Sequence, residues 1–205
     1  MKTLILVDIQ NDFLPGGALA VPRGDEVVSV ANRIQGQFDL VVATQDWHPK
    51  NHGSFAVNHP GKNPGDVIDL NGLQQILWPV HCVQNTKGAE FAPGLDKSSW
   101  SKIFPKGTDA GMDSYSGFFD NGKRKATGLG DYLKETGATD VYVMGLATDY
   151  CVSFTALDAV GLGYKTHLVL NGCRGVNLKD GDVDREILKM KSAGINLVNG
   201  ENLYR

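Results

Sequence analysis

Long hydrophobic runs and clusters of basic residues are both missing from this sequence. The N-terminal apolar stretch, residues 4–7, is interrupted by Asp8 long before it reaches the length of a secretion signal or a membrane span. The net charge is -3, and no Lys/Arg cluster supplies the electrostatic footprint that a nucleic-acid backbone requires. These absences predict a cytoplasmic protein that acts on a small molecule, with neither nucleic acid nor a membrane as its partner.

Cysteine is scarce as well. The three cysteines, Cys82, Cys151 and Cys173, are odd in number and far apart along the chain. Such a set is a poor disulfide framework and suits a reducing compartment. At least one thiol is therefore expected to be free.

The rest of the composition is that of a globular protein, with 41% hydrophobic and 21% charged residues. Since there is no internal repeat or linker, we expect one domain over residues 1–205. Runs rich in Val, Ile and Leu predict buried parallel strands at residues 4–7, 40–43, 141–144, 167–170 and 195–198. Helical patterns lie between them, around residues 27–34, 129–133, 152–159 and 183–190. This alternation predicts an α/β fold: three α/β/α layers with a doubly wound, mainly parallel sheet.

One region, residues 46–121, lacks sustained periodicity. It is rich in Gly, Pro, Asn, His and Trp. A loop of this length in a small domain is usually functional. We therefore expect an irregular insertion that binds metal and substrate, rather than a second domain.

Three reactive residues follow predicted strands. Asp8, Asp46 and Cys151 lie at or just after strand ends, where open α/β sheets bind their ligands. Cys151 is also expected near a helix N-terminus, which favours a thiolate and hence a nucleophile. The alternative is a small buried hydrophobic side chain, which is what most free cysteines are.

A mixed set of oxygen and nitrogen ligands is found at Asp46, His48 and His81. One carboxylate and two imidazoles suit Zn(II), Fe(II) or Mn(II). The alternative is an exposed loop aspartate with two ordinary histidines. His52 could be a fourth ligand or an orienting partner. Lys106, by itself, has the character of a solvated loop lysine.

Five motifs in order give the chain a family resemblance. They are D-x-Q-N-D-F at 8–13, D-W-H at 46–48, W-P-x-H-C at 78–82, F-x-K-G at 104–107 and G-x-A-T-D-x-C-V at 145–152. Together they resemble the nicotinamidase/pyrazinamidase family within the isochorismatase-like hydrolases. The resemblance covers nearly the whole chain, from about residue 4 to residue 198.

This resemblance implies a role for each matching residue. The catalytic triad would be Asp8, Lys106 and Cys151, and the backbone N–H groups of Ala147 and Cys151 would stabilise the oxyanion. The ligands of one divalent metal ion, with zinc favoured over iron or manganese, would be Asp46, His48 and His81. The aromatic residues around the substrate ring would be Phe13, Trp78 and Tyr115. The peptide joining Leu146 to Ala147 would be cis.

The implied reaction is hydrolysis of nicotinamide to nicotinate and ammonia through a cysteine thioester, in NAD salvage, with pyrazinamide as a second substrate. Three alternatives stay open from the residues. One is a cysteine amidase acting on a carbamoyl or ureido substrate, which would not need the metal ligands. The second is a metal-activated water with Cys151 as a bystander, and the third is a binding protein without catalysis. The sequence also leaves a homo-oligomer open.

Overall fold

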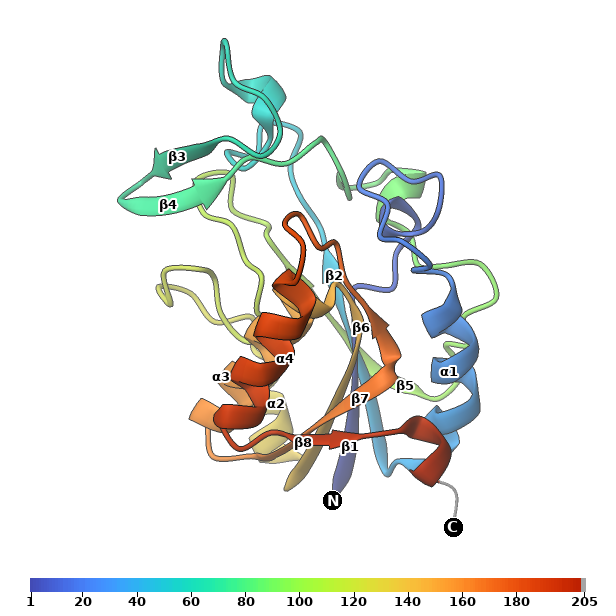
Figure 1. Cartoon of the computed structure of the whole chain (residues 1–205). Coiled ribbons are helices and arrows are strands. Elements are labelled where there is room, and N and C mark those ends of the chain that lie inside the picture. The colour runs from blue at the N-terminus through green and yellow to red at the C-terminus, as the bar shows by residue number, and fades with distance from the viewer. Residues whose placement is uncertain (204–205) are drawn as a thin grey trace.

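A six-stranded parallel sheet forms the centre of the molecule in this computed structural model, which describes residues 1–203 (Figure 1). The strand order is β5-β2-β1-β6-β7-β8, and every neighbouring pair is parallel. The strands are β1 (Lys2–Val7), β2 (Leu40–Asp46), β5 (Trp100–Lys106), β6 (Asp140–Leu146), β7 (Lys165–Arg174) and β8 (Asn196–Val198). The five predicted strands are all present, and the central ones are buried on both faces, as their continuous apolar runs require.

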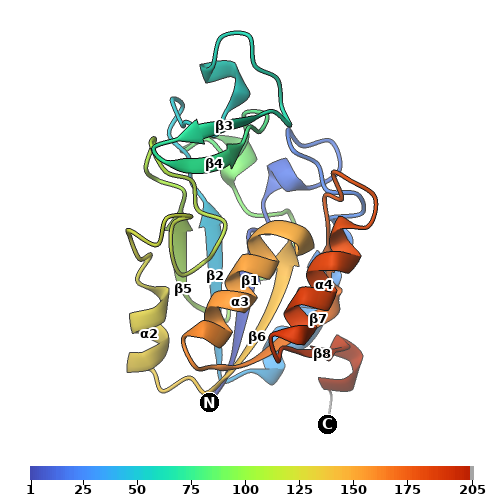
Figure 2. The same ribbon diagram turned by 60° about the vertical axis from the view of Figure 1, so that its left-hand side comes forward.

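Helices cover both faces of this sheet. They are α1 (Glu26–Ile34), α2 (Leu129–Glu135), α3 (Ser153–Gly161) and α4 (Asp182–Ser192). Figures 1 and 2 show α1 on one face and the other three on the opposite face. Right-handed crossovers explain this division, because the chain winds outward from β1 in one direction and from β6 in the other. The three-layer, doubly wound, mainly parallel fold is therefore confirmed.

The region expected to be irregular, residues 46–121, differs from the prediction in two places. Its residues Trp100–Lys106 form β5, an edge strand of the central sheet that pairs with β2. A hairpin of β3 (Val67–Leu70) and β4 (Leu73–Ile76) lies apart from that sheet, beyond its carboxyl edge (Figure 2). The remaining segments are held by turns and by the short helices η3 (Ala56–Asn58) and η4 (Lys87–Ala89).

The sheet register brings its carboxyl ends together. Asp46 at the end of β2 pairs with Lys106 at the end of β5, and Val7 at the end of β1 pairs with Gly145 in β6. The strand order reverses between β1 and β6, which is where ligands bind in folds of this class. The side chains that follow these ends therefore share one small volume.

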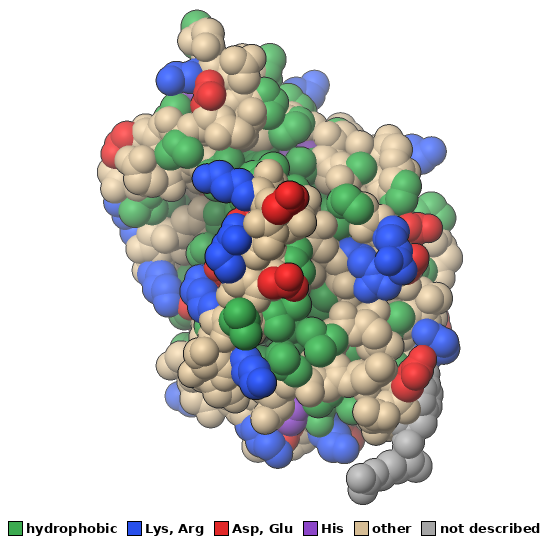
Figure 3. All heavy atoms as spheres, in the orientation of Figure 1, with side chains coloured by type: hydrophobic (Ala, Val, Ile, Leu, Met, Phe, Trp, Pro, Cys, Tyr) green, Lys and Arg blue, Asp and Glu red, His purple; other side chains and the backbone are tan. Residues whose placement is uncertain are grey.

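Acidic and basic side chains are interspersed over the face of the molecule drawn in Figure 3. No helix among residues 1–203 is long and apolar enough to cross a membrane.

Candidate active site

Asp8 lies directly after β1 and is completely buried. Its backbone has φ 47°, a left-handed conformation that turns the chain sharply away from the strand. Thr44 Oγ1 donates a hydrogen bond to Asp8 Oδ1 at 2.6 Å, and Lys106 Nζ lies 2.8 Å from Asp8 Oδ2. Burial raises the pKa of Asp8 to about 6, although Lys106 opposes that rise. A carboxyl group with this pKa can accept and return a proton near neutral pH.

Lys106 is the last residue of β5, and only 2% of it is exposed. The residue type alone suggested a solvated loop lysine, but Lys106 is a buried strand residue. Its ammonium group contacts both Asp8 and Asp46. It also donates to the Ser114 carbonyl at 2.8 Å and lies 3.3 Å from the Cys151 sulfur. Burial opposes the charge on this lysine, but the two carboxylates hold its pKa well above the usual value. A permanent cation thus lies between the two carboxylates and the thiol.

Cys151 lies in the short helix η5 (Thr148–Val152), which continues into α3. The residue is 7% exposed, and burial raises the pKa of its thiol well above the usual range, although Lys106 opposes the shift. A resting thiolate, expected from the helix N-terminus, is therefore disfavoured. A buried thiol beside a carboxylate of raised pKa needs that carboxylate as its proton acceptor, which is the arrangement found with Asp8.

The peptide bond joining Leu146 to Ala147 is cis, as the family resemblance implies. Ala147 and Cys151 both line the same cavity. The backbone positions named for the oxyanion are therefore on one wall.

Asp46, His48 and His81 form a buried cluster whose ligand atoms all lie within 4.8 Å of one another. The Nε2 atoms of His48 and His81 are 3.6 Å and 3.9 Å from Asp46 Oδ2. Each imidazole has its Nδ1 atom 2.8 Å from a backbone carbonyl, that of Gly107 for His48 and that of Pro79 for His81. These bonds fix the ring orientation and leave Nε2 facing Asp46, as the hydrogen-bond partners of metal-binding histidines do.

In this cluster, His81 and Asp46 have the protonation states that suit a metal, whereas His48 differs: burial would lower its pKa, but the Asp46 carboxylate raises it above the usual value. Burial, with the neighbouring His48, lowers the pKa of His81 to about 4, so that His81 is neutral at pH 7. Burial would raise the pKa of Asp46, but Lys106 and His48 hold it below its usual range. A neutral imidazole and an ionised carboxylate are the forms that bind a divalent cation.

Gly107 is needed where His48 packs. Its φ is +61°, and a Cβ atom there would lie 2.3 Å from His48 Cε1. The backbone can therefore approach the imidazole closely enough to accept its hydrogen bond only because the residue has no side chain.

His52 is buried beside this cluster but is not one of its three members. Its ring centroid lies 4.3 Å from that of His48, and its Nδ1 atom is 2.7 Å from Ser54 Oγ. Its Nε2 atom has no hydrogen-bond partner among the described residues. Burial, with His48, lowers the pKa of His52 to about 4. His52, His48 and Asp113 form a second group with atoms within metal-binding range of one another.

A narrow cavity of about 30 Å³ lies between the candidate nucleophile and the candidate metal ligands, since Cys151, Asp46 and His81 all line it. Its lining comprises Phe13, Leu19, Asp46, Trp78, His81, Asp113, Tyr115, Ala147, Tyr150, Cys151 and Val176. The three aromatic residues singled out from the sequence, Phe13, Trp78 and Tyr115, are all among them. The lining thus combines aromatic rings, a sulfur and the side chains of two candidate metal ligands, a set of groups whose chemistry suits a flat ring bearing a carbonyl group, although a cavity of about 30 Å³ must widen to admit one.

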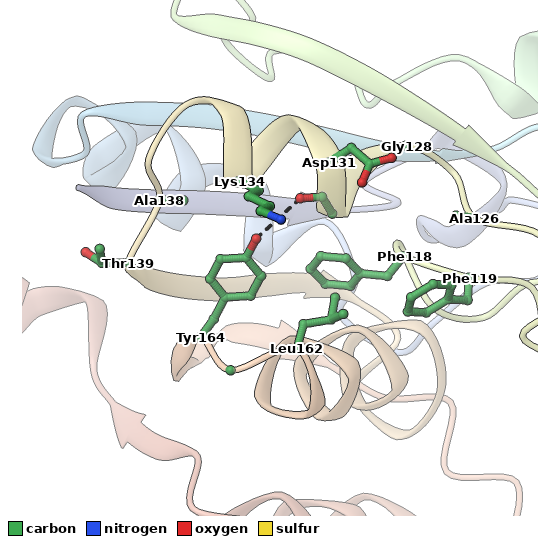
Figure 4. Close-up of a pocket in the computed structure, with 12 residues that line it drawn as sticks. Phe118, Phe119, Ala126, Gly128, Asp131, Lys134, Ala138, Thr139, Leu162 and Tyr164 are labelled. Carbon is green, nitrogen blue, oxygen red and sulfur yellow. Dashed lines mark hydrogen bonds between the residues drawn. The ribbon is translucent and has the colours of Figure 1, made fainter.

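A larger cavity, of about 650 Å³, lies elsewhere, beside α2 and the end of α3 (Figure 4). Phe118, Phe119, Leu162 and Tyr164 line it, with Asp131 and Lys134 from α2. None of the residues described above contributes to it, and it brings together no nucleophile and base. The smaller cavity is therefore the candidate active site.

Two side chains that support this site were not identified from the sequence as site residues. Gln10, fully buried, accepts from the Asp46 N–H at 2.8 Å and donates to the Asp46 carbonyl at 2.8 Å. Asp12 accepts from the Cys82 N–H at 2.7 Å, next to His81. Both belong to the D-x-Q-N-D-F segment, whose run of buried amides and acids was the available signal.

Comparison with known proteins agrees with this geometry. The isochorismatase domain family matches residues 2–201. A nicotinamidase of Escherichia coli (strain K12) is 50% identical over 200 residues, which cover 96% of this chain and 93% of that protein. The solved structure of an Acinetobacter baumanii nicotinamidase/pyrazinamidase is 46% identical, with a TM-score of 0.95 and coverage of 98% and 97%. A Pyrococcus horikoshii pyrazinamidase in complex with zinc is 39% identical, with a TM-score of 0.78 and coverage of 97% and 98%. The chain belongs to the isochorismatase family.

Proposed function

We propose that this chain is a nicotinamidase, an amidohydrolase that converts nicotinamide and water to nicotinate and ammonia in NAD salvage, and that it also accepts pyrazinamide. The observation that carries the proposal is one cavity lined by Cys151, by aromatic rings and by the Asp46 and His81 side chains. The similarity to nicotinamidases over nearly the full chain supports the same activity. A single hydrolase domain over residues 1–205 would carry it.

Three residues would perform the chemistry. Asp8 takes the proton of the Cys151 thiol, and the thiolate attacks the amide carbon of the substrate. Lys106, 2.8 Å from Asp8 and 3.3 Å from the sulfur, balances the negative charge as it moves between them. The Ala147 and Cys151 N–H groups stabilise the oxyanion; losing one such donor typically costs about 3 to 4 kcal/mol.

The second half of the reaction reuses the same base. Asp8 gives its proton to the departing ammonia as the tetrahedral intermediate collapses to a thioester. A water molecule, losing a proton to Asp8, then adds to the thioester carbon. Collapse of this second intermediate releases nicotinate and restores the Cys151 thiol.

Asp46, His48 and His81 would hold one divalent metal ion, with zinc favoured because a related pyrazinamidase was solved with it. When bound, such an ion offers a Lewis-acid position for the pyridine nitrogen of the substrate, which orients the ring. Phe13, Trp78 and Tyr115 would pack around that ring. His52 would be an additional ligand or a partner in the surrounding hydrogen-bond network.

The cellular setting follows from the cysteines and the substrate. All three cysteines are free and buried. This supports a cytoplasmic enzyme whose partner is a small molecule.

Ammonia release from a panel of amides tests the proposal. Nicotinamide and pyrazinamide should be hydrolysed, and benzamide, which lacks a ring nitrogen, should react far more slowly. Equal rates with benzamide and nicotinamide would show that a metal held by Asp46, His48 and His81 does not orient the substrate through its ring nitrogen. Turnover of a carbamoyl amide in preference to nicotinamide would instead favour a carbamoyl amidase.

Iodoacetamide separates this mechanism from one in which metal-activated water attacks directly. The metal-loaded enzyme should lose activity in proportion to alkylation of Cys151. Full activity of a Cys151→Ala variant would leave the thioester mechanism without support.

A further inference from the structure

The hairpin strand β4 sends one glutamine into the interior. Side chains alternate along a strand, and here Gln74 is exposed while Gln75 is only 3% exposed. The two N–H groups of the Gln75 amide face three acceptors, which are the Ile76 carbonyl at 2.7 Å, the Tyr115 hydroxyl at 3.0 Å and Asp113 Oδ2 at 3.0 Å, so the three acceptors share two hydrogens. One amide thus joins the hairpin to two residues that line the active-site cavity.

The Tyr115 hydroxyl is the meeting point of two elements. It accepts a hydrogen bond from Trp78 Nε1 at 3.0 Å, in addition to the one from Gln75. The Trp78 and Tyr115 rings meet edge to face, at 81° and with centroids 6.5 Å apart. Both rings also pack edge to face against Tyr150. Two separate loops are therefore fastened into one aromatic wall.

Asp113 adds a buried carboxyl group to this network. It is 3% exposed, and it accepts from the Ser114 N–H at 2.8 Å as well as from Gln75. A buried carboxylate that loses a hydrogen-bond donor bears a large desolvation cost, so the surrounding groups rearrange to satisfy it. Loss of the Gln75 amide would therefore disturb the segment that carries both Asp113 and Tyr115.

We infer that Gln75 is a positioning residue for substrate: through Tyr115 and Asp113 it holds the Trp78 and Tyr115 rings in place in the wall that a planar nitrogen-containing aromatic ring would contact. Gln75 does not line the cavity and does not touch the reacting atoms. Its effect is on how tightly the ring is held, because the cavity is narrow and a shift of about 1 Å in a wall is costly. This inference rests on the proposed function.

Gln75→Leu removes the amide while keeping a side chain of similar size. The KM for nicotinamide should rise about tenfold, because the hydrogen bonds that hold Tyr115 and Asp113 in the cavity wall are lost. The kcat should change by less than about twofold, since the nucleophile and its base are untouched. Gln74→Leu is the matched control: the same substitution on the same strand, on the exposed face, should leave both constants and the metal content as in wild type.

Tyr115→Phe provides a second route to the same result if Gln75→Leu folds poorly. It keeps the ring and removes the hydroxyl that both donors share, so its KM should also rise. In that background, Gln75→Leu should add less than about threefold, because the two changes break one network. Additive effects, or an unchanged KM in Gln75→Leu, would overturn the inference.

Near-ultraviolet circular dichroism and nicotinate titration report on the packing of the aromatic wall and on ligand binding without requiring catalysis. Gln75→Leu should alter the aromatic signal and weaken nicotinate binding, while Gln74→Leu does neither. If wild type fails to hydrolyse nicotinamide, the proposed function is wrong. If wild type is active but the two glutamine variants behave alike, only the role of Gln75 is wrong.

Discussion

The two halves of the active site are held in place by different means. Asp8, Lys106 and the turn before Cys151 are fixed by the parallel ladders of β1, β5 and β6. His81 and Trp78, in contrast, come from residues 47–99, where a two-stranded hairpin and single bridges are joined by turns. The sheet thus positions the groups that we propose react, together with the candidate metal ligand Asp46 at the end of β2, and the loops position most of the groups that we propose select and orient the substrate. Variants should therefore divide into those that stop chemistry and those that weaken binding.

The largest effect is expected on the sheet side, from Cys151→Ala. Removing the nucleophile should lower kcat on the order of 10⁴-fold or more. Metal content and nicotinate binding should stay as in wild type, because the loop side is intact. Elemental analysis and calorimetric titration check this, and a variant that loses its metal would show that the two halves are not separable.

On the loop side, His81→Ala should remove a metal ligand. The metal content should fall. The kcat/KM should also fall about 10²-fold, because without the metal ion the pyridine ring of the substrate is no longer held and its carboxamide is no longer aligned with Cys151. Alkylation of Cys151 by iodoacetamide should persist at the wild-type rate. His59→Ala is the control: this histidine belongs to the same loops, but within residues 1–203 its ring bonds only the Gly53 carbonyl. Equal metal loss in both variants would contradict the assignment of His81.

Gln10 connects the two halves, because its side chain bonds the N–H and the carbonyl of Asp46 at the end of β2 and also donates to the Ala89 carbonyl in the loop region. Gln10→Leu should weaken metal binding by about 10-fold to 100-fold, as loss of a supporting hydrogen bond does. Gln45→Leu serves as the matched control, since Gln45 donates to the same Ala89 carbonyl but does not bond Asp46 through its side chain. Competition with a chromogenic chelator measures the difference. Identical metal affinities in the two variants would refute the role of Gln10.

The smallest effect is the pH dependence set by Asp8. With its pKa raised to about 6 by burial, kcat/KM should reach half of its maximum near pH 6 and fall about tenfold per unit below that. Thr44→Val removes a hydrogen bond to the ionised carboxyl group, so it should raise this pKa and move the profile to higher pH. If the fall of kcat/KM at low pH is unchanged in Thr44→Val, Asp8 is not the group whose protonation causes it.

The raised pKa of Asp8 also affects stability: activity rises with pH, whereas the contribution of Asp8 to stability falls with pH. The folded state holds the Asp8 proton more tightly than the unfolded state, whose pKa is near 3.8. Between about pH 4 and pH 6, the contribution of Asp8 to the free energy of unfolding therefore falls as pH rises. Denaturant titrations of wild type and Asp8→Asn at pH 5 and pH 7 measure it.

The sequence alone predicted the buried part of the fold well. Continuous apolar runs such as residues 4–7 can only be interior strands here, and the residues after them lie where the sheet topology requires. Edge strand β5 was missed because its sequence, WSKIFPK, is mostly exposed and contains a proline. The β3–β4 hairpin was missed although Asn71-Gly72, both with positive φ, is a strong hairpin signal.

Missing β5 also decided what could be said of Lys106. As a loop residue it has no reason to be buried, whereas as the last residue of a strand it lies against Asp46 on β2. Only the family resemblance could assign it. The partners of Gln10 and Gln75 were out of reach for another reason: these bonds join residues between 36 and 79 positions apart, and no local pattern encodes such pairs.

The two outer strands of the sheet bear on how the protein behaves at high concentration. An open strand edge is a template for pairing with another chain. On one side, Pro105 in β5 has no N–H group to offer, and Lys102 places a charge on the same strand. On the other side, β8 is three residues long. Pairing of sheet edges between molecules is therefore discouraged at both borders. Replacing Pro105 should increase light scattering during refolding, while the activity of the protein that does refold changes little.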